Sequence, residues 1–197
     1  MHCHYLPSHG NVPPPPASVG RGILGAVERR DRLSLTEWAT LGLLAERPRH
    51  GYDIAVELAP GASVGQVWHA PRHAVYRALD RLTDLGHAEE RRTETGNAAP
   101  QRTVYGTTRR GRRALQDWLD TPVDHLRDVR SDLLLKLALA DRLDRPSRAL
   151  IDRQRSRFAP LLDARVDPDR PLEPVDRWRM HAARAVDAFL QELAATR

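Results

Sequence analysis

The sequence predicts a mainly α-helical protein that also carries one small β-hairpin. Apolar residues recur at helical spacing in several segments, and the clearest stripe consists of Val75, Leu79, Leu82 and Leu85. The segment 88–107 differs, because two short runs with β-favouring residues flank Gly96-Asn97, a dipeptide typical of turns. Helices before and after one hairpin are therefore the expected order of elements.

The charge of the chain is concentrated in one segment. The chain has 197 residues, which suits one domain or a small domain with an accessory one, and its 41% of apolar residues is enough for a core. The net charge is +5, and residues 71–113 contain ten Arg against five acidic residues. The rest of the chain is balanced, so this segment is the one expected to meet phosphate.

The sequence predicts a cytoplasmic protein without a membrane segment. No apolar run approaches the ~20 residues that a membrane helix needs, and the N-terminus lacks the basic and apolar blocks of a signal peptide. The single cysteine, Cys3, excludes an internal disulfide, which fits a reducing compartment.

The composition divides the chain into three parts. Residues 1–31 form a Pro-rich tail, because Pro13 to Pro16 exclude a helix, and we expect this tail to be disordered. The tail contains His2, Cys3, His4 and His9. A metal site there is disfavoured, since nothing would hold the ligands in place, and no metal is expected. Residues 32–121 are predicted to form one domain and residues 122–197 a helical region.

Two helices are expected at the start of the first domain. Ser34 and Glu37 have the spacing of a capping box, and the apolar helix that follows ends near Glu46, before Pro48. A turn containing Pro48 and Gly51 leads into the second helix. Its predicted inward-facing residues are Tyr52, Ile54, Ala55 and Leu58.

The third helix is predicted over residues 71–86. Pro71 suits the first helical position, and Gly86 stands where a left-handed cap belongs. Opposite the apolar stripe, this helix carries Arg72, His73, Tyr76, Arg77 and Arg81. A helix with one buried stripe and one basic face fits a DNA major groove, and the alternative is a surface helix with solvated charges.

A two-stranded ribbon follows the third helix, formed by residues 88–93 and 102–107. Arg91, Arg92 and Arg102 lie along it or near its tip, where they could enter a minor groove or grip phosphate. Thr108 then caps a further helix, which begins with several Arg and contains Trp118. Three helices followed by a ribbon form a winged helix-turn-helix.

Three amphipathic helices are predicted in the C-terminal region, over 127–143, 147–166 and 175–195. The first is apolar almost all round and must be buried on more than one side, so a partner chain is the simplest explanation. The last carries a long apolar stripe formed by Trp178, Ala182, Ala185, Phe189 and Leu193.

Several motifs in residues 35–119 resemble a known family, the PadR-type bacterial transcriptional regulators. The motifs are Leu41-Gly42-Leu43-Leu44, Pro48 with His50-Gly51-Tyr52-Asp53-Ile54, Val75-Tyr76 with Leu79-Asp80-Arg81-Leu82 and Leu85-Gly86, and Arg102 with Tyr105, Thr107 and Gly111. The resemblance implies DNA binding, C-terminal dimerisation helices and, in many members, release from DNA by a small aromatic or drug-like molecule.

The hypothesis is therefore a dimeric, sequence-specific DNA-binding regulator, most simply a repressor, with a palindromic operator. Trp118 and Trp178 are candidates to line an effector pocket. The rival hypothesis is a winged-helix module that binds an acidic protein instead of DNA. An enzyme is disfavoured and no cofactor is expected, because the sequence lacks a Gly-rich phosphate loop, a paired-His metal motif and a nucleophile motif.

Overall fold

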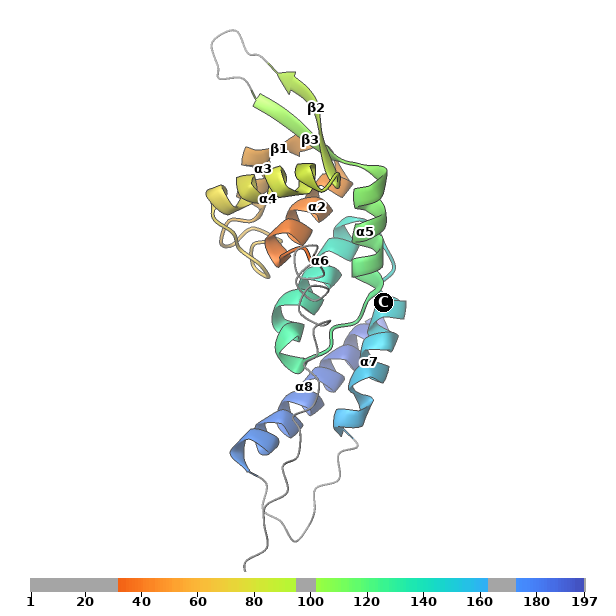
Figure 1. The fold of residues 1–197 in the computed structure, drawn as a ribbon. Helices are drawn as coiled ribbons and strands as arrows, with labels where there is room; N and C mark the ends of the chain where they lie inside the picture. The colour runs from red at the N-terminus through yellow and green to blue at the C-terminus, as the bar shows by residue number, and fades with distance from the viewer. Residues whose placement is uncertain (1–31, 95–101, 163–172, 197) are drawn as a thin grey trace, which may run out of the picture. The chain divides into compact units, whose positions relative to one another are not determined.

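The computed structural model describes residues 32–94, 102–162 and 173–196. The predictions made for residues 1–31, including the disfavoured metal site, lie outside the described residues. Within them the fold is mainly helical with a small antiparallel sheet, as the sequence predicts (Figure 1).

The first three described helices form the core of the winged-helix part. They are α2 (Leu35–Glu46), α3 (Gly51–Glu57) and α4 (Arg72–Asp84). The capping box of α2 is confirmed, since the Glu37 amide donates to Ser34 Oγ at 3.3 Å and the Ser34 amide donates to Glu37 Oε2 at 2.6 Å. Pro71 is the N-cap of α4 rather than its first helical residue.

Helix α4 packs on α2 through the predicted apolar stripe. Val75, Leu79 and Leu82 are fully buried in the same cluster as Leu41 and Leu44 of α2. The chain leaves α4 through Gly86, whose φ of +69° lies in the left-handed region that glycine adopts without strain. The stripe and both ends of α4 therefore follow from its own residues.

The predicted two-stranded ribbon belongs to a three-stranded sheet. Strands β2 (Ala88–Glu94) and β3 (Arg102–Thr107) pair as expected, but β1 (Arg49–His50) joins the other side of β3, so the order is β1-β3-β2. In β1, Arg49 faces Tyr105 and His50 faces Val104. The prediction of a simple turn before α3 was wrong, because two residues are too few to show a period in the sequence.

Helix α5 (Arg109–Asp120) begins against the end of α4. The Thr108 hydroxyl accepts from the Gly111 amide at 3.0 Å, which confirms the predicted cap, and donates to the Gly86 carbonyl at 2.7 Å. A side chain at position 111 would overlap the His87 carbonyl oxygen, so glycine allows the first turn of α5 to touch the α4–β2 connection.

The first C-terminal helix differs from its prediction. It begins as a 3-10 turn (Leu126–Asp128) and a π turn (Val129–Leu133) and becomes α6 only at Leu134–Arg142. Its apolar residues Leu133, Leu135 and Leu139 are fully buried within this chain, where Gly42 of α2 leaves room for Leu139. The apolar surface of this helix therefore does not require a partner chain.

Helices α7 (Arg148–Leu162) and α8 (Pro174–Thr196) pack side by side. The buried residues of α8 are Ala183, Leu190 and Ala194, whereas the predicted stripe starting at Trp178 lies one residue earlier and is exposed or half-exposed. Two residues of the predicted stripe, Phe189 and Leu193, are partly buried and pack against the same core, whereas Trp178 is exposed. No helix among the described residues is long and apolar enough to span a membrane.

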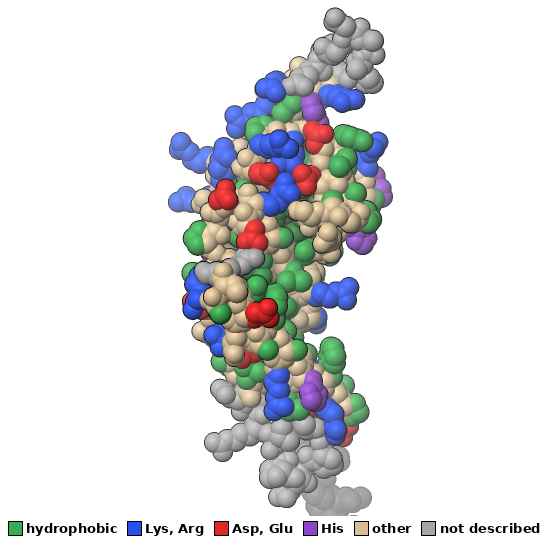
Figure 2. Space-filling model, turned by 180° about the vertical axis from the view of Figure 1, so that it is seen from behind, with side chains coloured by type: hydrophobic (Ala, Val, Ile, Leu, Met, Phe, Trp, Pro, Cys, Tyr) green, Lys and Arg blue, Asp and Glu red, His purple; other side chains and the backbone are tan. Residues whose placement is uncertain are grey.

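Four charged side chains join α6 to the winged-helix part. Arg142 of α6 donates to Glu46 Oε2 at 2.8 Å and to both oxygens of Glu57 at 3.0 and 3.2 Å. Arg49, with 3% of its side chain exposed, also pairs with Glu46, at 3.2 Å. Burial lowers the pKa of Arg142, but the hydrogen bonds to both glutamates and their negative charges together raise it above its ordinary value. Figure 2 shows that acidic and basic side chains also lie side by side on one face of the molecule.

Candidate nucleic-acid interface

The face of α4 opposite its buried stripe is exposed and basic at its N-terminal half. Arg72, His73, Tyr76 and Arg77 are all exposed there, as the sequence predicts for a helix with one buried side. The C-terminal half exposes Asp80 and Asp84 instead. Any anion that approaches this helix is therefore attracted to its first two turns.

Tyr52 lies on this surface, which the sequence prediction missed. Its side chain is 48% exposed, and the Arg72 guanidinium lies 4.8 Å from the centre of its ring. The inward orientation predicted for Tyr52 was wrong. Helical periodicity could have shown this, because Tyr52 precedes the buried Ile54 by two residues, or about 200° around a helix.

Tyr76 owes its position to a glycine in the neighbouring helix. A Cβ placed at Gly51 would lie 2.9 Å from Tyr76 Cε1 and 3.0 Å from Leu79 Cδ1. Contacts that short are repulsive, so a larger residue at position 51 would push α3 away from α4. Gly51 thus allows α3 to lie close to Tyr76, and the next residue, Tyr52, contacts Arg72 of α4.

Arg77 faces the start of α2. It lines a hollow of about 320 Å³ together with Ser34, Thr36 and Glu37 at the N-terminal end of α2 and with Ala74, Ala78 and Arg81 of its own helix. The Glu37 carboxylate, which caps the N-terminal end of α2 and pairs with Arg81, lies in the same hollow, so the positive potential there comes mainly from Arg77.

Arg81 forms an ion pair within the protein. Its Nε lies 3.1 Å from Glu37 Oε1, and the other carboxylate oxygen of Glu37 accepts from the Ser34 amide. Glu37 is thus shared between the cap of α2 and α4. The sequence predicted Arg81 as a DNA contact, and the structure gives it a second role in holding these helices together.

The three wing arginines have different surroundings. The side chain of Arg91 lies across Gly106, where a Cβ would be 2.7 Å from Arg91 Nε, and pairs with Glu89 at 2.9 Å. Arg91 stands at the shift in strand register between Glu90 and Arg92, typical of a β-bulge. Arg92 and Arg102 are both exposed, near the residues 95–101 that the structure does not describe.

The two candidate effector residues lie in different environments. Trp118 stacks on Trp38 with ring centroids 4.8 Å apart and planes at 8°, and Lys136 Nζ lies 4.9 Å from its ring centre. Trp178, in contrast, is 70% exposed near the start of α8. Trp118 therefore already has partners inside the chain, whereas the ring of Trp178 is open to a ligand or another protein.

The winged-helix part of the chain matches a known family. Residues 40–117 match the model of the transcriptional regulator PadR-like family. The match runs from α2 through α4 and the wing into α5, so the PadR-like segment contains the basic face of α4. The family is one of transcriptional regulators and not of enzymes.

Three solved structures illustrate the similarity. Bacillus subtilis PadR in complex with operator DNA shares 24% identity over 85% of this chain and 100% of that chain, with a TM-score of 0.45. The same PadR in complex with p-coumaric acid shares 23% identity over 82% of this chain and 94% of that chain, with a TM-score of 0.38. The Vibrio cholerae virulence activator AphA shares 24% identity over 82% of this chain and 92% of that chain, with a TM-score of 0.35. No curated protein sequence matches the chain.

A double-mutant cycle tests the contact between Tyr52 and Arg72 in this PadR-like surface. We expect Tyr52→Leu and Arg72→Ala to be coupled by about 0.5–1 kcal/mol in urea unfolding, because a cation over an exposed ring contributes that much. Tyr52→Phe keeps the ring and should keep the coupling. Strictly additive effects would show that the two side chains do not interact in solution.

Proposed function

We propose that the chain is a sequence-specific DNA-binding regulator that reads its operator with the N-terminal half of α4. The observation that supports this most strongly is the division of α4 between a fully buried stripe and an exposed edge with Arg72, His73, Tyr76 and Arg77. Helix-turn-helix proteins contact base edges with the first residues of this helix, where the positive side chains of α4 gather.

Arg77 and Arg72 are the side chains proposed to read bases, and Tyr76 and Arg81 to contact phosphates. A guanidinium can bind the O6 and N7 of guanine with two hydrogen bonds, and the ring of Tyr52 limits the positions available to Arg72. The wing residues Arg91, Arg92 and Arg102 would add affinity that does not depend on sequence and falls with salt.

Substitution of Arg77 tests this proposal. Arg77→Ala should weaken binding to DNA from upstream of the protein's own gene by about 1–3 kcal/mol. Binding to random DNA should weaken by less than this. The matched control is Arg184→Ala, which removes another exposed arginine, on α8. Gel shifts at several salt concentrations provide the measurement.

Two outcomes would contradict the proposal. If Arg77→Ala weakens binding to both DNAs equally, Arg77 contacts only phosphate. If the unmodified protein shifts no DNA even at low salt, the basic face serves an acidic protein partner and the chain is an interaction module.

We further propose that two copies of the chain associate through the C-terminal helices and bind a palindromic operator. The exposed apolar side chains Trp178 and Val175 of α8 and Leu161 and Leu162 of α7 support this, because apolar patches of this kind mark interfaces. A two-fold dimer would place two copies of α4 on successive turns of the duplex.

The mass in solution tests the dimer. Light scattering should give twice the chain mass for the unmodified protein, and Trp178→Asp should weaken association by about 2 kcal/mol or more, or about thirtyfold. Arg177→Ala, at a neighbouring exposed position, should leave the mass unchanged. A monomeric unmodified protein, or a Trp178→Asp variant that still dimerises with full affinity, would refute this interface.

The proposed regulator represses transcription in the cytoplasm and is released by a small aromatic or drug-like molecule. The exposed ring of Trp178 supports stacking with such a molecule, whereas Trp118 would have to leave Trp38 or Lys136 to take part. A coupling of about 1–3 kcal/mol between effector and operator would be enough for release.

A further inference from the structure

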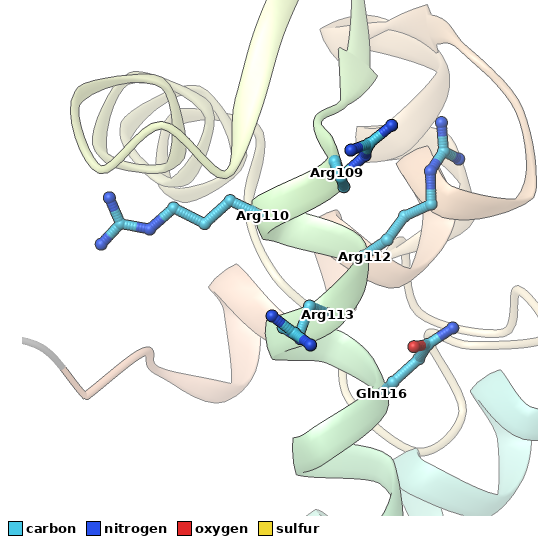
Figure 3. Close-up of a pocket in the computed structure, with 5 residues that line it drawn as sticks. All are labelled: Arg109, Arg110, Arg112, Arg113 and Gln116. Carbon is cyan, nitrogen blue, oxygen red and sulfur yellow. The ribbon is translucent and has the colours of Figure 1, made fainter.

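Helix α5 begins with four arginines in five residues: Arg109, Arg110, Arg112 and Arg113. All four are exposed, and within the described part of the chain none of them forms an ion pair or a side-chain hydrogen bond. With Gln116 they line a hollow of about 820 Å³, and Figure 3 shows their side chains spread outward from the first turns of the helix. We call these four residues the α5 arginine cluster.

The α5 arginine cluster works against the stability of its own helix. The N-terminus of a helix is the positive end of its dipole, where acidic residues are favourable, yet α5 has none in its first turn. The spacings of three and four residues also make the like charges neighbours on the helix surface, and each such pair is unfavourable. Helix α2, in contrast, has Glu37 at this place.

The fold holds the cluster in a fixed position beside α4 and the wing. The Thr108 hydroxyl binds the Gly86 carbonyl, and Gly111 lies against the His87 carbonyl. Burial and the nearby charge of Arg110 both lower the pKa of His87, which lies in the connection between α4 and β2. Figure 3 shows Arg110 pointing away from Arg109 and Arg112, toward the side where α4 lies.

We propose that the α5 arginine cluster binds the DNA phosphate backbone next to the bases read by α4. This inference rests on the proposed function. Guanidinium groups bind phosphate oxygens with paired hydrogen bonds, and a duplex offers a continuous row of them. The duplex held by α4 is the polyanion nearest to the cluster, and its charge would offset the repulsion that otherwise destabilises the start of α5.

The test replaces three of the four charges. In a variant with Arg109→Gln, Arg112→Gln and Arg113→Gln, affinity should fall about tenfold or more near 0.1 M salt, by the same factor for operator and random DNA. The slope of log affinity against log salt should become shallower by about 0.9 for each lost phosphate contact. The melting temperature of the free variant should stay the same or rise, because repulsion at the helix start is removed.

Two further variants separate a local contact from total charge and from misfolding. Arg130→Gln, Arg177→Gln and Arg184→Gln together remove the same charge from exposed C-terminal positions and should leave the salt slope nearly unchanged. Replacing Arg109, Arg112 and Arg113 with Lys keeps the charge and should preserve the slope.

The outcomes distinguish this inference from the proposed function. If the unmodified protein binds DNA and the three-Gln variant binds with the same affinity and the same salt slope, the α5 arginine cluster does not contact DNA. The proposed function of α4 would then be unaffected. A C-terminal control that weakens binding as much as the cluster variant would also overturn it. Failure of the unmodified protein to bind any DNA would refute the proposed function itself.

Discussion

The packing of the α4 stripe is the constraint on which the interface depends. Val75, Leu79 and Leu82 are fully buried against α2, and each contributes roughly 1.5–3 kcal/mol to folding. Since one face of α4 must stay in the core, the rotation of this helix about its axis is fixed. Its cationic edge is thereby presented to solvent beside the wing, and no separate interaction is needed to orient Arg77. The same core fixes α3, whose Gly51 allows the close approach of α3 to Tyr76.

The structure also divides the many arginines into two groups that composition alone cannot separate. Arg49, Arg81 and Arg142 are paired with glutamates and hold α2, α3, α4 and α6 together. Arg72, Arg77 and the α5 arginine cluster have no acidic partner in the described part of the chain. A charge that the fold does not neutralise is fully available to an external anion, whereas a paired one, such as that of Arg81, also stabilises the protein. The Arg142 pairs also give the C-terminal helices a direct contact with the winged-helix part.

Local patterns predicted most of the winged-helix part because its signals are short-range. The capping box at Ser34, the stripe of α4 and the turn at Gly86 are each determined within a few residues. The failures concern long-range contacts. The pairing of β1 with β3 joins residues about 55 apart, and the Arg81–Glu37 pair joins residues 44 apart, so neither has a local pattern. On α8 the sequence predicts the apolar stripe, but tertiary packing decides which of its residues are buried: Phe189 and Leu193 pack against the core and Trp178 is exposed. The DNA-contact, effector and dimer assignments remain predictions.

The position of α4 on DNA can be measured directly. In a chain with Cys3→Ser and His73→Cys, an iron-chelate reagent attached at position 73 would cut the nearest DNA strand. A helix seated by its first turns in the major groove should give strong cuts inside each operator half-site, related by two-fold symmetry. The same reagent at position 184, on α8, should give none. Equal cutting from both positions, or no cutting from position 73 in a complex that still forms, would contradict the assignment of α4 as the DNA-reading helix.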